Sequence, residues 1–159
     1  MVIAKRVVDE TNRYRLNAGL RPLVWYEELA TIATGHCDAL KGGLVTGSAG
    51  FQSRVQNFPY KSSNSAENIA KLGSRRYSIR VCGSWEIGTK RVKYDVAKEA
   101  VEEWIVSEPH RNVLEGDFNA AGVGAIMADD YTWYIVSIYA KFEPAVVNTR
   151  GAFISNQTR

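Results

Sequence analysis

Hydrophobic positions in the first forty residues follow the period of an α-helix. In residues 2–17 the apolar side recurs every three or four residues, at Ile3, Val7, Val8, Thr11 and Tyr14. A second stripe runs through residues 25–41, at Leu29, Ile32, Ala33, His36, Cys37 and Leu40. Gly19 and Pro22 are typical of a helix end, and Gly42 with Gly43 closes the second run. The pattern predicts two consecutive amphipathic helices.

The middle of the chain loses this period. Residues 43–66 are rich in Gly, Ser and Asn, which predicts a loop with one short helical turn around residues 51–56. Residues 67–72 ("ENIAKL") are interpreted as a short strand. Residues 74–94 alternate in places, which predicts a hairpin that turns near Gly88.

A helical pattern returns after Asp95. This residue is a suitable N-terminal cap for a third helix over residues 96–107. Its inner face comprises Ala97, Ala100, Val101, Trp104 and Ile105. Pro109 disfavours helix at the residue before it and starts a new short helix, which Gly116 ends.

Two strands are predicted near the C-terminus, over residues 120–128 and 131–142, joined at Asp129 and Asp130. Both alternating sets of the second strand are apolar: Tyr131, Trp133, Ile135 and Tyr139 on one side, and Tyr134, Val136, Ile138 and Phe142 on the other. A strand that is apolar on both faces is covered on both. We therefore predict an α+β fold, a three-layer α-β-α sandwich whose small, mainly antiparallel sheet lies between helices.

Composition adds limits. The 159 residues suit one domain, and 45% apolar with 23% charged residues is ordinary for a globular protein. The sequence contains no run of 18 apolar residues, so no membrane-spanning helix is predicted. The N-terminus lacks the apolar core and cleavage site of a signal peptide. We therefore expect either a cytoplasmic protein or a secreted one whose leader has been removed.

Charge and cysteine content leave alternatives open. A net charge of +3 does not indicate a nucleic-acid partner. Residues 71–98 hold eight Lys or Arg against two acids, which suits a solvated insertion or a strip that binds an anionic partner. Cys37 and Cys82 are the only cysteines, so one disulfide is possible, whereas a zinc site built from cysteine pairs is not.

Four segments in order resemble the CAP superfamily of cysteine-rich secretory, antigen 5 and pathogenesis-related proteins, and its bacterial SCP-like domains most of all. They are "VVDETNRYRLNAGLRPLVWYEELATIATGHCDAL", "SAENIA", "AVEEWIVSEPHRNVL" and "AAGVGAIMADDYTWYIVSIYA". The resemblance covers residues 4 to 142. It implies an α-β-α sandwich. We predict a single domain over residues 1–142 and a C-terminal tail over residues 143–159 that wraps the surface or is partly disordered.

The resemblance also implies a central cleft with two histidines and two acids, often able to hold a divalent metal. The acid of "AENIA" is Glu67, and the histidine before arginine is His110. Val45 stands where the second histidine is usual, and Ser107 where the second acid is usual. Glu103 lies one helical turn before Ser107 and can face the same cleft. Half of the family's four cleft residues is therefore replaced.

Three functions follow as hypotheses. The first is an extracytoplasmic domain that works by binding a small ligand, a lipid or a protein, with no cofactor. The second is a metal-dependent hydrolase or peptidase that uses Glu67 and His110, with weak binding of a divalent metal such as zinc. The third is an interaction module that binds anionic partners through residues 71–98. His36, on its apolar stripe, is interpreted as a hydrogen-bonded core residue rather than a third ligand. No catalytic residue, partner or oligomeric state is fixed by the sequence.

Overall fold

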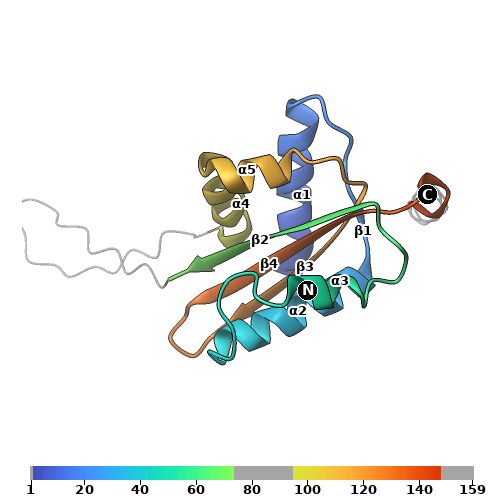
Figure 1. The fold of residues 1–159 in the computed structure, drawn as a ribbon. Coiled ribbons are helices and arrows are strands. Elements are labelled where there is room, and N and C mark those ends of the chain that lie inside the picture. Colours follow the sequence, from blue (N-terminus) through green and yellow to red (C-terminus); the bar gives the residue numbers. More distant parts are fainter. Residues whose placement is uncertain (1, 74–94, 148–159) are drawn as a thin grey trace, which may run out of the picture.

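The computed structural model describes residues 2–73 and 95–147, which form a sheet between two helical layers. Figure 1 shows α1, α4 and α5 on one face of the sheet and α2 and α3 on the other. The elements are α1 (Val2–Asn17), β1 (Val24–Trp25), α2 (Glu27–Lys41), α3 (Phe51–Val55), β2 (Asn64–Leu72), α4 (Val96–Val106), α5 (Glu108–Leu114), β3 (Ala120–Met127) and β4 (Trp133–Lys141). A further helical turn begins at Pro144. The predicted α-β-α sandwich is confirmed.

The four strands lie in the order β1-β3-β4-β2. β4 pairs antiparallel with both β3 and β2, and only the two-residue β1 runs parallel to its neighbour β3. Among the described residues, β2 is therefore an edge strand. The predicted predominance of antiparallel pairing is confirmed.

Each face of the sheet carries its own apolar cluster, because side chains alternate along β4. Ile135 and Tyr139 face α1 and α4, whereas Val136 and Ile138 face α2. Trp104 of α4 and Leu29 of α2 are the largest apolar side chains that the helices bury in these two clusters. From Trp133 to Phe142 the two apolar sides predicted for this strand are both buried or half-buried. Tyr131, which was predicted to belong to the strand, lies before β4 and is 61% exposed.

Helix α2 lies directly on the backbone of β3. A Cβ atom added at Gly122 would stand 2.2 Å from the amide nitrogen of Ala30, and one at Gly124 would stand 2.5 Å from that of Thr34. These distances are shorter than any van der Waals contact, so both positions require glycine. The close approach brings the inner face of α2 onto the sheet without side chains between the two backbones.

Most predicted boundaries hold, and the differences have local causes. Asp95 caps α4 by accepting a hydrogen bond from the amide of Lys98 at 3.3 Å. The second helix begins two residues later than predicted, because the backbone of Val24–Trp25 pairs with β3 instead. β2 begins three residues earlier than predicted, at Asn64, since its pairing with β4 extends to Lys141. The hairpin predicted over residues 74–94 lies outside the described residues.

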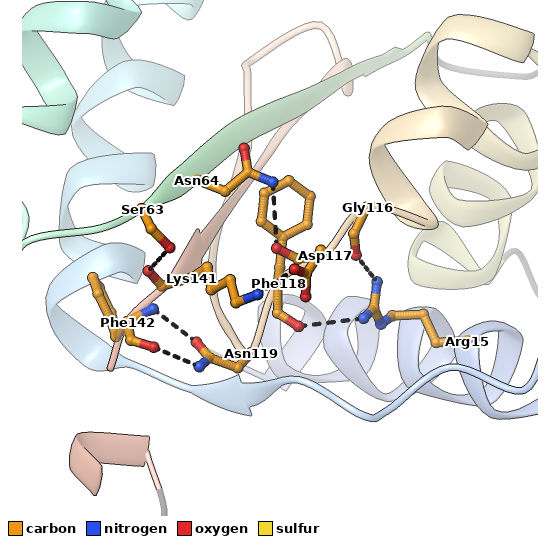
Figure 2. Close-up of polar contacts among 9 residues, drawn as sticks. All are labelled: Arg15, Ser63, Asn64, Gly116, Asp117, Phe118, Asn119, Lys141 and Phe142. Carbon is orange, nitrogen blue, oxygen red and sulfur yellow. Dashed lines mark hydrogen bonds and ion pairs between the residues drawn. The ribbon is translucent and has the colours of Figure 1, made fainter. Parts of the chain in front are cut away.

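The segment after α5 is fastened to α1 and to the sheet (Figure 2). The side chain of Arg15 is buried and donates hydrogen bonds to four backbone carbonyls, at Arg21, Leu114, Gly116 and Phe118, over 2.7 to 3.3 Å. Asn119 both accepts from the amide of Phe142 at 2.9 Å and donates to its carbonyl at 2.8 Å. These bonds fix the C-terminal end of α5, and with it the direction of the helix that carries His110.

The tail predicted after residue 142 begins inside the molecule. Val147 is buried, and it packs with Val146 against the cluster on the α2 side. An open depression of about 520 Å³ lies beside this turn, between Tyr60, Phe142 and the lysines Lys61 and Lys141.

Candidate functional site

His110 lies at the junction of α4 and α5, where the sequence places a proline. Ser107 ends one helix and begins the other in an extended conformation, with φ −92° and ψ 115°. Its hydroxyl makes no capping bond to the backbone and instead lies 2.9 Å from Nδ1 of His110. Both side chains are half-buried. Ser107 therefore orients the imidazole, while part of the ring stays open to solvent.

The helix junction is tied to β2 by two side chains. Asn68 donates from Nδ2 to the backbone carbonyl of His110 at 3.0 Å, and Trp104 donates from Nε1 to the carbonyl of Ile69 at 3.1 Å. Both Asn68 and Trp104 are buried. The "ENIA" segment and the "PHRNVL" segment are thus brought together, but Asn68 rather than Glu67 makes the contact.

Glu67 points to the opposite face of the sheet, as strand alternation requires for the neighbour of Asn68. Its carboxylate oxygen Oε1 accepts a hydrogen bond from Nη2 of Arg54 at 2.5 Å and lies 3.9 Å from Nε2 of His36. Only 2% of the Glu67 side chain is exposed. The carboxylate is therefore the buried partner of two groups on α2 and α3.

The same two partners hold the loop that contains Val45. His36 Nε2 lies 2.8 Å from the carbonyl oxygen of Gly47, and Arg54 donates from Nη1 to that of Ala49 at 2.7 Å. His36 is 4% exposed, so its interpretation as a hydrogen-bonded core residue is confirmed. Val45 itself is half-buried at the start of the loop.

The predicted cleft residues thus fall into two groups. His110, Ser107 and the half-buried Glu103 belong to the layer of α4 and α5. Glu67 belongs to the opposite layer, near the loop that carries Val45. Within residues 2–73 and 95–147, no hydrogen bond or ion pair joins Glu67 to His110.

A divalent metal, which the resemblance implies, does not fit these residues. Catalytic zinc sites use three protein ligands with an open position. The described part of the chain contains no group of three His, Cys, Asp or Glu side chains that could hold a metal ion. Glu67 is already neutralised by Arg54, and a metal would have to displace that guanidinium.

One residue of the α2 side, Arg54, could not be identified from the sequence pattern. Arg54 has no motif of its own, and only its position within the predicted helical turn at residues 51–56 hinted that it is ordered. Cys37 is a buried free thiol. Burial raises the pKa of the Cys37 thiol to about 12, which makes it a poor nucleophile. Cys82 lies outside the described residues.

The fold and these contacts define a three-layer α+β domain with a sheet bounded by two helical layers. The family model described as "CAP: Cysteine-rich secretory protein family" matches residues 8–139. The chain therefore belongs to the CAP family. No protein among the curated sequences compared matches it.

Solved structures share the fold. An extracellular protein of Bacillus anthracis that contains an SCP domain is 22% identical, with a TM-score of 0.63; the match covers 88% of this chain and 40% of that one. A cysteine-rich secretory protein of Staphylococcus aureus is 20% identical, with a TM-score of 0.59, and 88% and 39% are covered. An outer surface protein of Borrelia burgdorferi is 16% identical, with a TM-score of 0.65, and 87% and 92% are covered.

The chain spans about two fifths of the length of the first of these structures. At these identities the likeness establishes the fold alone. The similar bacterial proteins are described as extracellular, secretory or outer-surface proteins. Among the described helices, none combines the length and apolar character needed to cross a membrane.

Proposed function

We propose that this CAP domain acts by binding rather than by turnover, through the surface around the junction of α4 and α5. His110 and Ser107 offer a hydrogen-bonding pair that is partly open to solvent, and Glu103 lies one turn earlier on α4. Val106, beside them, is 80% exposed. An imidazole, a hydroxyl and an exposed apolar side chain suit a small ligand, or a protein segment, with polar and apolar parts.

One observation carries this proposal. Glu67 is 2% exposed and its Oε1 atom lies 2.5 Å from Arg54 Nη2. A general base or metal ligand must reach the reacting atoms, and Glu67 would have to leave a buried guanidinium to do so. Glu67 serves instead to anchor Arg54 and the loop of residues 45–50.

We place this domain outside the cytoplasm. The proposal draws on the family and on the extracellular or outer-surface descriptions of the similar bacterial proteins. Secretion would be checked by expressing the gene from its native locus and testing the cell fractions and the medium for the protein.

A hydrolase is the second candidate, because the Ser107 hydroxyl lies 2.9 Å from Nδ1 of His110. A serine beside a histidine is the minimal pair for nucleophilic catalysis. No orienting acid contacts this histidine within the described residues. We therefore rank this function below binding.

The experiment measures zinc binding and peptide hydrolysis on the same protein. Calorimetry with Zn²⁺ should give the same small heat for the wild type and for His110→Ala. Digestion of a fluorogenic peptide library by the wild type, with and without Zn²⁺, should not exceed digestion by Ser107→Ala, and Ser53→Ala is the matched control for a serine substitution elsewhere. Hydrolysis that is lost in both Ser107→Ala and His110→Ala would establish the enzyme and refute the binding proposal.

The third candidate, an anionic partner for the basic segment, falls largely on residues 74–94, outside the described residues. It is tested by retention on heparin and on anionic vesicles as a function of salt. Neutralising Arg75, Arg76, Lys90 and Arg91 together should abolish retention if this segment binds the partner. Unchanged retention of this variant would exclude binding of an anionic partner through this segment.

A further inference from the structure

The open depression of about 520 Å³ lies where β2 begins and β4 ends, on the α2 side of the sheet. Its lining comes from two segments, residues 60–63 and residues 141–146. The amide of Ser63 donates to the carbonyl of Lys141 at 3.0 Å, and Figure 2 shows the Ser63 hydroxyl beside the same carbonyl. Small-ligand sites typically have volumes of about 300 to 1,000 Å³. The depression is therefore large enough for a small molecule.

One wall of the depression is aromatic and is held in place from several sides. The buried ring of Phe142 packs edge to face against three other rings. They are Tyr26, Phe58 and Tyr60, at centroid distances of 5.1, 6.4 and 5.5 Å. Asn119 also binds both the amide and the carbonyl of Phe142 (Figure 2). Tyr60 is 39% exposed, so its ring offers an aromatic surface to a ligand.

Three charged side chains line the depression, and one of them already has a partner of opposite charge. Lys141 forms an ion pair with Asp117, and Figure 2 shows its side chain extended toward that residue. Lys61 and Glu143 are exposed. Within residues 2–73 and 95–147, neither of these two side chains forms an ion pair. The lining thus presents one ammonium group and one carboxylate that these residues do not neutralise.

This combination of charges restricts the class of ligand. A simple anion would be attracted by Lys61 and repelled by Glu143, and a simple cation would meet the opposite pair of effects. A molecule that carries both charges avoids the repulsion. Aromatic rings pack well edge to face at centroid distances of about 4.5 to 7 Å, the arrangement that Tyr60 already makes with Phe142. An aromatic group on the ligand would therefore suit the wall that Tyr60 exposes.

We propose that this depression binds an aromatic amino acid in its zwitterionic form. The α-carboxylate of the ligand pairs with Lys61, its α-ammonium group pairs with Glu143, and its ring packs against Tyr60. Phe142 belongs to the apolar cluster on the α2 side, whereas His110 belongs to the layer of α4 and α5. This site is therefore separate from the surface proposed above, and neither proposal depends on the other.

The first test is an NMR titration of the isotope-labelled full chain with L-phenylalanine. We expect saturable shifts of the backbone amides of Ser62, Ser63 and Val146, whereas the amides of α5 remain unchanged. Absence of saturable shifts at the three amides would overturn the proposal. Binding at the junction of α4 and α5 would instead shift the amides of α5, so the two sites are distinguished in the same spectra.

Three related compounds test which parts of the ligand are recognised. The compound 3-phenylpropanoate lacks the ammonium group, and phenethylamine lacks the carboxylate. Each should bind about two- to fivefold more weakly than L-phenylalanine, the range expected for the loss of one exposed ion pair. L-Leucine keeps both charges without a ring and should also bind more weakly. If any of the three binds as tightly as L-phenylalanine, a zwitterion with an aromatic ring is not the ligand.

Two variants test the two charged groups separately. Lys61→Gln should weaken the binding of L-phenylalanine and 3-phenylpropanoate by about two- to fivefold, and should not weaken that of phenethylamine. Glu143→Gln should weaken the binding of L-phenylalanine and phenethylamine, and should not weaken that of 3-phenylpropanoate.

The matched controls are Lys41→Gln and Glu102→Gln, because both residues are exposed and neither lines the depression. These controls should leave all affinities unchanged. Spectra of the four variants, away from the altered residue, verify that each keeps the fold. If both Lys61→Gln and Glu143→Gln weaken all three ligands alike, or weaken none of them, the assignment of the two charged groups is refuted.

Discussion

Two consecutive residues of β2 have different roles on the two faces of the sheet. Glu67 faces α2 and α3, where its charge is buried and neutralised by Arg54. Asn68 faces α4 and α5, where a neutral hydrogen bond holds the backbone of a half-exposed histidine. A buried ion pair is costly to break and hard to use. The neutral side leaves His110 accessible, so the difference separates the stabilising half of the predicted cleft from the half suited to binding.

The largest effect is expected on the charged side. Glu67→Ala leaves the Arg54 guanidinium largely buried without its carboxylate, and we expect the free energy of unfolding to fall by about 3 to 5 kcal/mol. Urea denaturation measures the change. The exposed pair of Lys98 and Glu102 supplies the control, Glu102→Ala, which should alter stability little. Equal effects of the two substitutions would mean that Glu67 is not a structural anchor.

A slightly smaller loss is expected from the anchor of α5. Arg15→Met removes hydrogen bonds to four carbonyls while it keeps most of the side-chain volume, and should cost about 3 kcal/mol. The exposed Arg13, which pairs with Glu10 in its own helix, provides Arg13→Met as the control. If Arg15→Met leaves the free energy of unfolding unchanged, buried hydrogen bonds do not stabilise the side of the sheet that carries His110.

Alkaline pH should destabilise the α2 side through Cys37. Burial raises the pKa of its thiol from 9.0 to about 12, so the folded state holds this proton more tightly than the unfolded state. Its contribution is complete below pH 9 and is lost as pH rises toward 12. Between pH 8 and about pH 10.5 the wild type should lose about 2 kcal/mol more than Cys37→Ala. If the urea midpoints of the two proteins change in parallel as pH rises, the Cys37 thiol is accessible to solvent.

The smallest effect on stability belongs to His110. His110→Ala removes a half-exposed ring with one side-chain hydrogen bond, so we expect a loss below about 1 kcal/mol by urea denaturation. The carbonyl that Asn68 holds is retained in this variant. A loss as large as that of Glu67→Ala would make His110 a structural residue and remove the contrast between the two sides.

The fold was accessible from the sequence because its signals are local and agree with one another. The stripe on α2, the cap at Asp95 and the doubly apolar β4 each reflect one period or one residue. The short β1 was missed because two residues carry no period, and its existence depends on pairing with a strand almost a hundred positions later.

The site was predictable only in part. The order of motifs singled out Glu67, Ser107 and His110, and the strand period implies that Glu67 and Asn68 point apart. Nothing in the sequence pairs Arg54 with Glu67, because they are 13 positions apart on α3 and β2, and the loop between these elements has no regular period. Arg15 was likewise hidden, since backbone carbonyls leave no signature in a sequence.

Gly122 and Gly124 give the contact between α2 and β3 a further property, that of matched repeat lengths. Two residues of strand advance about 6.6 Å. The four helical residues from Ala30 to Thr34 advance about 6.0 Å. Successive turns of α2 therefore pack on successive glycines of β3, because the two repeat lengths are nearly equal. Helix α2 can therefore shift along β3 only by a whole turn at a time. The two glycines thus fix the position of His36 along the sheet.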